Sequence, residues 1–170
     1  SMKQIAIFQS DLRVGGIQKA LVNILNEIDY STCCVDVYLF DKECFFDVPV
    51  HKNLNIRYLP PMPSYFRLLY FGLVMELSGD VTGGKAYDVA VDFSSYRNEC
   101  AVGAIKANAK KRVMWIHNDV EIKRANEPKY RVLWHFFKGK LKYYDAFAAV
   151  SPGIIEGFRR ATGIQDKPIT

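Results

Sequence analysis

The sequence has few of the residues that build disulfide frameworks or metal sites. It contains four cysteines and three histidines among 170 residues, and no two cysteines form a C-x-x-C pair. Cys33 and Cys34 are adjacent within an expected strand, so their side chains would point to opposite faces of a sheet. His51 and His135 do not cluster with cysteines or carboxylates at the spacing of metal ligands. These absences predict a reduced, cytoplasmic protein without a structural zinc.

The sequence also lacks the two best-known glycine motifs for phosphate binding. An apolar run is followed by V-G-G-I-Q-K, in which Gly15 and Gly16 are adjacent and Lys19 stands three positions later. This spacing excludes G-x-G-x-x-G, which needs a small residue at the last place, and also G-x-x-x-x-G-K-[ST]. Two interpretations remain open: the backbone N–H groups of a helix N-terminus bind an anion here, or the glycines form a tight turn without a ligand.

Signatures of nucleic-acid binding are absent as well. The sequence contains no zinc-finger spacing, no RNP signature and no GXXG loop, so nucleic acid is not an expected partner. The most apolar segment, expected to form a helix from Ser64, its N-cap, to Leu77, is too short to cross a bilayer. It is either a buried helix or an apolar surface that meets a lipid or a partner.

The positive charge of the chain is concentrated in one segment. Seven of the 23 lysines and arginines lie in residues 122–144, whereas Glu127 is the one acidic residue there among 18 in the chain. Apolar residues fall near one face of the helix expected over residues 130–144. Away from that face lie Arg131, Lys138, Lys140 and Lys142. The pattern suits a helix lying on an anionic membrane surface, and equally a helix packed on a sheet with a solvated basic face.

Short apolar runs alternate with segments of helical periodicity along the whole chain. The expected strands are Ile5–Phe8, Val35–Phe40, Asn55–Leu59, Asp88–Phe93, Arg112–Ile116 and Ala146–Val150. The expected helices cover residues 17–28, 64–77, 97–107, parts of 120–143, and 154–161. Residues 163–170 are expected to form a loop and the start of another strand. Strands separated by helices predict an α/β fold, a three-layer Rossmann-like domain with a mostly parallel sheet.

Polar residues follow four of these strands at their carboxyl ends, where open parallel sheets bind ligands. The candidate binding residues are Gly15, Gly16, Ser94, Asn118, Asp119 and Ser151. His117 directly follows the run RVMWI, so it stands at the end of a strand. A histidine there can bond a hydroxyl or phosphate group or move a proton. The alternative is a structural histidine whose ring is bonded by the backbone.

The order of these pieces resembles the N-terminal domain of a GT-B glycosyltransferase, and it is most similar to glycosyltransferase family 4. The resemblance rests on the double glycine before the first helix, the histidine in VMWIHND, and the strand and helix of YDAFAAVSPGIIEGF. It implies that residues 1–170 form the N-terminal, acceptor-side half of a two-domain GT-B architecture. A C-terminal donor-binding domain would lie outside this chain.

The resemblance also implies an activity. The whole protein would be a retaining hexosyltransferase of polysaccharide biosynthesis, with a nucleotide sugar as donor substrate, no cofactor and no metal. Gly15 and Gly16 match a loop that approaches the donor phosphate or the acceptor, and His117 matches a catalytic-centre histidine that contacts the donor sugar. Ser151 lies where members present polar groups to the cleft. The family's two glutamates separated by seven residues are absent here, as expected if the donor domain lies elsewhere.

The implied partners are a glycan or lipid-linked acceptor and an anionic membrane surface. Many enzymes of this kind act on membrane acceptors, so we expect peripheral attachment to the inner face of the membrane. Two alternatives remain open: a GT-B-fold nucleotide-sugar epimerase, and a stand-alone α/β binding or signalling domain.

Overall fold

The computed structural model describes residues 1–63, 65–66, 69–94 and 96–170, and its centre is a six-stranded sheet. The strands are β1 (Lys3–Gln9), β2 (Cys33–Leu39), β3 (Leu54–Tyr58), β4 (Ala86–Asp92), β5 (Asn108–Ile116) and β6 (Ala146–Ala149). They lie in the order β3-β2-β1-β4-β5-β6, and every neighbouring pair is parallel. The expected α/β, Rossmann-like fold is confirmed.

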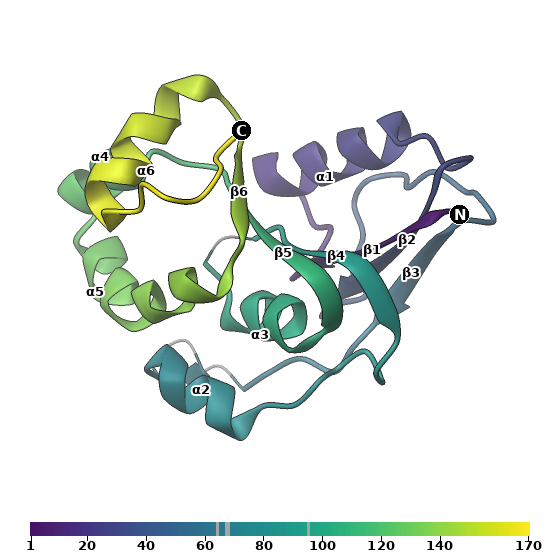
Figure 1. The fold of residues 1–170 in the computed structure, drawn as a ribbon, viewed down its shortest axis with the longest axis horizontal. Coiled ribbons are helices and arrows are strands. Elements are labelled where there is room, and N and C mark those ends of the chain that lie inside the picture. The colour runs from purple at the N-terminus through teal and green to yellow at the C-terminus, as the bar shows by residue number, and fades with distance from the viewer. Residues whose placement is uncertain (64, 67–68, 95) are drawn as a thin grey trace.

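Helices cover both faces of this sheet (Figure 1). They are α1 (Gly16–Glu27), α2 (Phe71–Leu77), α3 (Asn98–Lys106), α4 (Val120–Asn126), α5 (Pro128–Phe137) and α6 (Ile155–Thr162), with 3-10 helices η2 (Lys138–Tyr143) and η3 (Pro152–Ile154). Helix α1 lies on one face, and α2 and α3 lie on the other. Because the chain runs outward in opposite directions from β1 and β4, their carboxyl ends form the topological switch point of the sheet.

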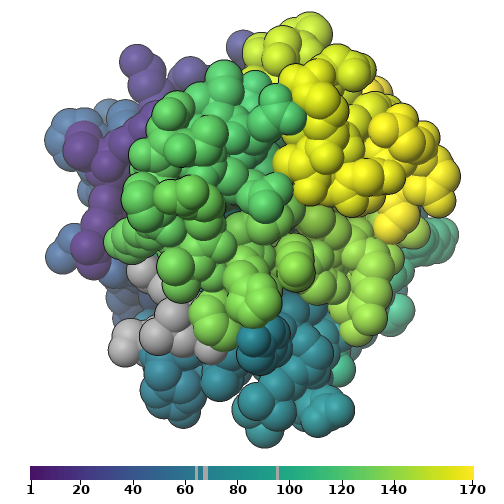
Figure 2. Space-filling view, turned by 90° about the vertical axis from the view of Figure 1, so that its left-hand side faces the viewer, coloured from purple at the N-terminus to yellow at the C-terminus, as the bar shows by residue number. Residues whose placement is uncertain are grey.

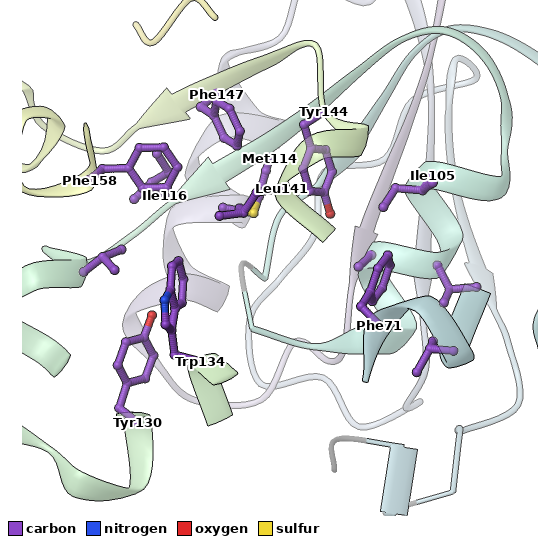
Figure 3. Packing of buried hydrophobic residues seen from close by; sticks show 14 of the residues in the cluster. Phe71, Ile105, Met114, Ile116, Tyr130, Trp134, Leu141, Tyr144, Phe147 and Phe158 are labelled. Atoms are coloured by element: carbon purple, nitrogen blue, oxygen red, sulfur yellow. The ribbon is translucent and has the colours of Figure 1, made fainter. Parts of the chain in front are cut away.

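The two faces of β5 belong to different apolar clusters, as the alternation of side chains along a strand requires. Met114 and Ile116 pack with residues of α2, α3, α5 and α6 (Figure 3). Val113 and Trp115 pack against the cluster that includes residues of α1. Phe93, which follows β4, belongs to the α1 cluster too. The side chain after Ile116, His117, therefore points to the α1 side.

A close approach between α3 and β1 sets the height of α3 above the sheet. A Cβ on Gly103 of α3 would lie 2.2 Å from a ring carbon of Phe8, which is fully buried. Phe8 in turn stacks on Tyr38 of β2, with ring centroids 4.9 Å apart. The glycine thus lets α3 rest on an aromatic pair, and this contact positions the N-terminus of α3 beside the switch point.

The single helix expected from Ser64 to Leu77 is interrupted at Tyr70, and residues 67–68 lie outside the described part of the chain. Helix α2 begins at Phe71, and the preceding residue Tyr70 is extended, with φ −59° and ψ 138°. Residues of this segment also contact other elements: Tyr70 is hydrogen-bonded to His135 of α5, at 2.8 Å between Oη and Nε2, and the Phe66 carbonyl accepts from the Asn98 side chain. The proposed N-cap, Ser64, lies outside the described residues.

The helix expected over residues 130–144 also needs correction. It ends at Phe137 and continues as the 3-10 helix η2, which turns Lys140 inward. Lys140 is 1% exposed, and its Nζ donates to Asp92 Oδ2 at 3.3 Å. The reason lies in β4, where Asp92 is fully buried and requires a counter-charge. Lys140 is therefore a core residue and does not add to the solvated basic face.

The end of the chain lies beside β6, and it contains one bridge where the start of another strand was expected. Ile169 forms a parallel bridge with Phe147, and Ala149 donates a backbone hydrogen bond to Thr170. Among the described residues, no helix has the length and apolarity needed to span a membrane.

Candidate functional site

The residues expected to bind ligands lie along one edge of the sheet, after four neighbouring strands. Gly15 and Gly16 follow β1, Ser94 follows β4, His117 follows β5, and Ser151 follows β6. Since adjacent strands are spaced by about 4.8 Å, the ends of β1 and β6 are about 14 Å apart. The candidate residues are therefore spread along the edge of the sheet and do not converge on a single point.

Gly15 and Gly16 lie at the start of α1, and their backbone conformations are ones that other residues can also adopt. Gly15 is the N-cap with an extended backbone (φ 164°, ψ 162°), so it is not in the left-handed region that favours glycine. At Gly15 a Cβ would meet only the flexible end of Gln18, and at Gly16 it would enter open space among the described residues. A tight left-handed turn is thus excluded, and the open space at Gly16 leaves room for an outside group.

His117 has one ring nitrogen bonded by the protein. Its Nε2–H donates to the backbone carbonyl of Phe93. The His117 and Phe93 rings pack edge to face, with their centroids 4.7 Å apart. Because a carbonyl only accepts, this bond fixes the tautomer and leaves Nδ1 as the acceptor of the neutral ring. Burial lowers the pKa of His117 from its ordinary value of 6.5, against the opposing effects of the Phe93 carbonyl and Asp92. At neutral pH the ring is therefore uncharged, and no hydrogen bond to Nδ1 comes from the described part of the chain.

Ser94 is buried and already engaged within the protein. Its Oγ donates to Asp92 Oδ1 at 3.3 Å and accepts from the backbone N–H of Arg97, also at 3.3 Å. Asp92 Oδ2 accepts one hydrogen bond from the Tyr144 hydroxyl, at 2.6 Å, and another from the Lys140 ammonium group. Ser94 thus joins a buried charged network to the start of α3 and holds this loop in place. Its hydroxyl is less accessible to a ligand than its position at the sheet edge suggested.

Asp119 and its neighbours mainly build the start of α4. Asp119 is the N-cap, and its Oδ1 accepts from the Ile122 N–H at 3.0 Å. A Cβ on Gly157 of α6 would lie 2.5 Å from the same oxygen, so α6 packs directly on the cap. Asn118 is half-buried beside it. Ser151 is exposed and its side chain does not cap η3, so its hydroxyl is accessible.

A second group of polar residues lies on the α3 side of the same edge, and sequence reasoning did not select it. Ser10, Asp11, Arg97 and Glu99 line a cavity of about 250 Å³ there. The available signal was positional: Ser10 and Asp11 follow β1, and Glu99 lies in the first turn of the helix that follows β4. The sheet edge therefore carries His117 and the glycines, together with a cavity that lies between the loop after β1 and the start of α3.

The described residues contain no group of three or more histidines, cysteines or acids that could hold a metal ion. All four cysteines are free thiols. Burial raises the pKa of the Cys100 thiol well above its ordinary value, with further contributions from Glu99 and Asp92. This thiol is therefore not a nucleophile.

Neither protein-family models nor curated protein sequences show a relative of the chain. No protein-family model matches it. A search of curated proteins likewise found no significantly similar sequence.

Proposed function

We propose that this chain is the acceptor-binding half of a retaining glycosyltransferase, which transfers a sugar from a nucleotide-sugar donor to a glycan or lipid-linked acceptor. The observation that carries the proposal is His117: a neutral ring at the end of β5, oriented by the Phe93 carbonyl, with Nδ1 as its remaining acceptor. A ring fixed in this way suits a sugar hydroxyl, which donates to Nδ1. The resemblance to family 4 glycosyltransferases supports the same role.

In this reaction the bond from the anomeric carbon to the diphosphate breaks, and a bond to the acceptor oxygen forms on the same face of the sugar. The acceptor hydroxyl passes its proton to the leaving diphosphate, whose developing negative charge needs stabilisation. On the α1 side, the N–H groups at the start of α1 are aligned with the helix dipole and favour an anion. His117 orients the donor sugar. Most of the charge stabilisation would come from the donor-binding domain.

The proposal is tested by nucleotide-sugar turnover of the full-length protein. We expect diphosphate release with one of a panel of UDP-, GDP- and ADP-sugars, and a product that retains the anomeric configuration of the donor. Gly16→Val should lower turnover about 10- to 100-fold at unchanged stability, because a side chain would fill the open space through which a ligand approaches the α1 N–H groups.

Gly79→Val is the matched control for that substitution. A Cβ at Gly79, in the loop that leads to the amino end of β4, also enters open space among the described residues, but away from the carboxyl edge of the sheet, so turnover should be unchanged. Equal turnover of Gly16→Val and the unmodified protein would contradict the role of the loop. Interconversion of two nucleotide sugars without transfer would indicate an epimerase. If the protein consumed no nucleotide sugar, the result would favour the alternative of a stand-alone binding domain.

We further propose that a patch formed by α2 and α5 attaches the enzyme to the anionic inner face of a membrane. Tyr70 and the α2 residues Leu73 and Leu77 are exposed apolar side chains. Arg131 of α5 and Lys138 of η2 are exposed cations on the same helical segment as His135 and Phe136, which Tyr70 contacts. Tyr70 contacts Phe136 at 5.0 Å, and Figure 2 shows α2 below α5 and η2 on one face of the molecule. Apolar side chains bordered by lysine and arginine favour an interface with anionic lipid.

Liposome flotation of the full-length protein tests this attachment. We expect binding to vesicles with anionic lipid at low salt, and about a tenfold or larger loss in the double variant Arg131→Glu/Lys138→Glu, since each cation near an anionic surface contributes about 1 kcal/mol. The variant Lys52→Glu/Lys111→Glu makes the same charge change at exposed positions outside the patch and should still bind. Absence of flotation at low salt, or an equal loss in both variants, would contradict the patch.

A further inference from the structure

The two edges of the sheet differ in what covers them. Beside β6, Ile169 forms a parallel bridge with Phe147, and the Thr170 N–H donates to the Phe147 carbonyl at 3.2 Å. At the opposite edge (Figure 1), β3 pairs with β2 on its inner side, and no strand or bridge of the described chain lies on its outer side. An uncovered edge strand can pair with a strand of another chain.

The backbone of β3 points outward at every second residue. Just after the strand, the Leu59 N–H donates to β2 at 2.8 Å. With the parallel register, the odd-numbered residues therefore direct their backbone groups to β2, and the outward groups belong to Leu54, Ile56 and Tyr58. The Leu54 N–H donates to the His51 carbonyl at 3.1 Å. The N–H groups of Ile56 and Tyr58 have no acceptor in the described part of the chain.

The sequence of β3 offers little protection against such pairing. It contains no proline and no lysine, which commonly protect an edge. Its one charged side chain, Arg57, is directed to the buried carboxylate of Asp36, with Nε 3.6 Å from Oδ1. Tyr58 is 45% exposed, so apolar surface remains uncovered at this edge. An added strand would therefore cover apolar surface without burying an unpaired charge.

The order of the side chains makes β3 complementary to an antiparallel copy of itself. With a two-fold axis at Ile56, the two Ile56 residues face each other, and each Tyr58 faces Leu54 of the other copy. Each Ile56 N–H then donates to the other Ile56 carbonyl, and each Tyr58 N–H donates to a Leu54 carbonyl. Both outward donors of each chain are thereby satisfied. On the other face of the sheet, each Arg57 lies opposite Asn55, so no two like charges meet.

The neighbouring antiparallel registers are less favourable. If the axis passed through Arg57, two guanidinium groups would lie directly opposite each other, and like charges at such positions are destabilising. If the axis passed through Asn55, Tyr58 would lie opposite Lys52, which is outside β3. The register centred on Ile56 thus agrees with both the hydrogen bonds and the charges.

We propose that β3 pairs with β3 of a second copy of this chain, antiparallel and centred on Ile56, so that the two sheets join into one. The partner is a second copy because one strand supplies both halves of the match: its donors face its own acceptors, and its one cation faces its own Asn55. The strand has five residues, and small interfaces are weak, so the dimer forms reversibly with concentration. The inference is independent of the proposed function, since it uses none of the candidate binding residues.

Sedimentation velocity of the chain over about 5–500 µM tests the association, because small interfaces associate weakly. We expect the average mass to rise with concentration from that of one chain toward that of two. Ile56→Pro should raise the dissociation constant about tenfold or more, because proline removes the central outward N–H and is tolerated at an edge where no bond to β2 is lost. Circular dichroism checks that this variant is folded.

Cysteine cross-linking tests the register in variants that keep the backbone N–H groups. Both variants carry Cys44→Ser, which removes the exposed native thiol. Ile56→Cys places two thiols on the two-fold axis, where the facing Cα atoms of a hydrogen-bonded pair are about 5.5 Å apart, within the range of a disulfide. Tyr58→Cys is the matched control on the same strand: its two thiols would be about 14 Å apart along the strands, too far to bond.

With diamide as the oxidant, which takes up the two electrons and two protons of the thiol pair, we expect at least about ten times more covalent dimer from Ile56→Cys than from Tyr58→Cys. The Cys44→Ser parent should remain uncrosslinked. A chain that stays monomeric over the whole concentration range would overturn the inference and leave the edge to an extended peptide of another protein. Equal cross-linking of the two variants, or dimerisation that Ile56→Pro leaves unchanged in a folded chain, would overturn it as well.

Discussion

Lys140→Met is expected to lower the free energy of unfolding by about 3–5 kcal/mol, measured by urea denaturation followed by tryptophan fluorescence. The side chain keeps its length, but the ammonium group that lies 3.3 Å from Asp92 is lost. Asp92 is fully buried in β4, so its carboxylate would remain in the core with only hydrogen-bond donors such as the Tyr144 hydroxyl. An uncompensated buried charge is among the most costly defects that one substitution can produce.

A control and a double variant make this prediction specific to the ion pair. Lys142→Met changes an exposed lysine two residues away and should alter stability by no more than about 0.5 kcal/mol. The double variant Asp92→Asn/Lys140→Met removes both charges and should recover a large part of the loss. If Lys140→Met unfolds with the stability of the unmodified chain, or if the double variant is less stable than both single variants, the buried pair does not stabilise this fold as described.

His117→Ala is expected to lower kcat/KM of the full-length enzyme by about 10²- to 10⁴-fold, measured as nucleotide release from the donor. The ring is the oriented polar group at the end of β5, and alanine removes both its Nδ1 acceptor and its bond to the Phe93 carbonyl. His135→Ala removes an exposed histidine of α5 and should leave kcat/KM within about threefold. If the His117→Ala variant had normal activity, we would conclude that His117 has a structural role only, through its hydrogen bond to the backbone.

The pH dependence of that activity has a definite sign. In the proposed reaction the neutral imidazole accepts a hydrogen bond from the sugar, so activity should be constant near pH 7–8 and should fall as the pH drops through the lowered pKa of His117. Stability changes in the same direction. The folded-state pKa is below the unfolded value of 6.5, so between these two values the unfolded chain binds more protons and stability decreases as the solution becomes more acidic. His117→Ala should flatten both profiles.

Much of the fold could be predicted from the sequence because the governing interactions are local in the chain. Runs such as DVAVDF and AFAAV are apolar at every other position or throughout, and each forms a strand of the parallel sheet. The spacing of Ile17, Leu21 and Ile24 specifies a helix face without reference to any other element. Parallel strands with helical connections then place their carboxyl ends at one edge, so the positions of His117 and Ser151 followed from topology.

Predictions failed where a residue's environment comes from distant parts of the chain. Tyr70 leaves the expected helix because it contacts α5, 65 residues away in the sequence. Lys140 lies in a segment whose basic composition is typical of a solvated helix face. It is nevertheless buried, because it forms an ion pair with the buried carboxylate of Asp92. Local periodicity contains no information on either contact, since both depend on which elements the fold brings together.

The sequence by itself determined the strand and helix order, the parallel sheet, and the set of polar residues at its carboxyl edge. The tertiary structure alone decided which of them remain available. Ser94 is hydrogen-bonded to Asp92 and to the backbone N–H of Arg97, and Asp119 is hydrogen-bonded to Ile122. By contrast, His117 Nδ1, the Arg97 guanidinium and one oxygen each of Asp11 and Glu99 have no partner among the described residues. The physical reason is that a polar atom's hydrogen-bonding capacity is filled by whichever groups packing places within about 3 Å, and packing is not encoded in spacing along the chain.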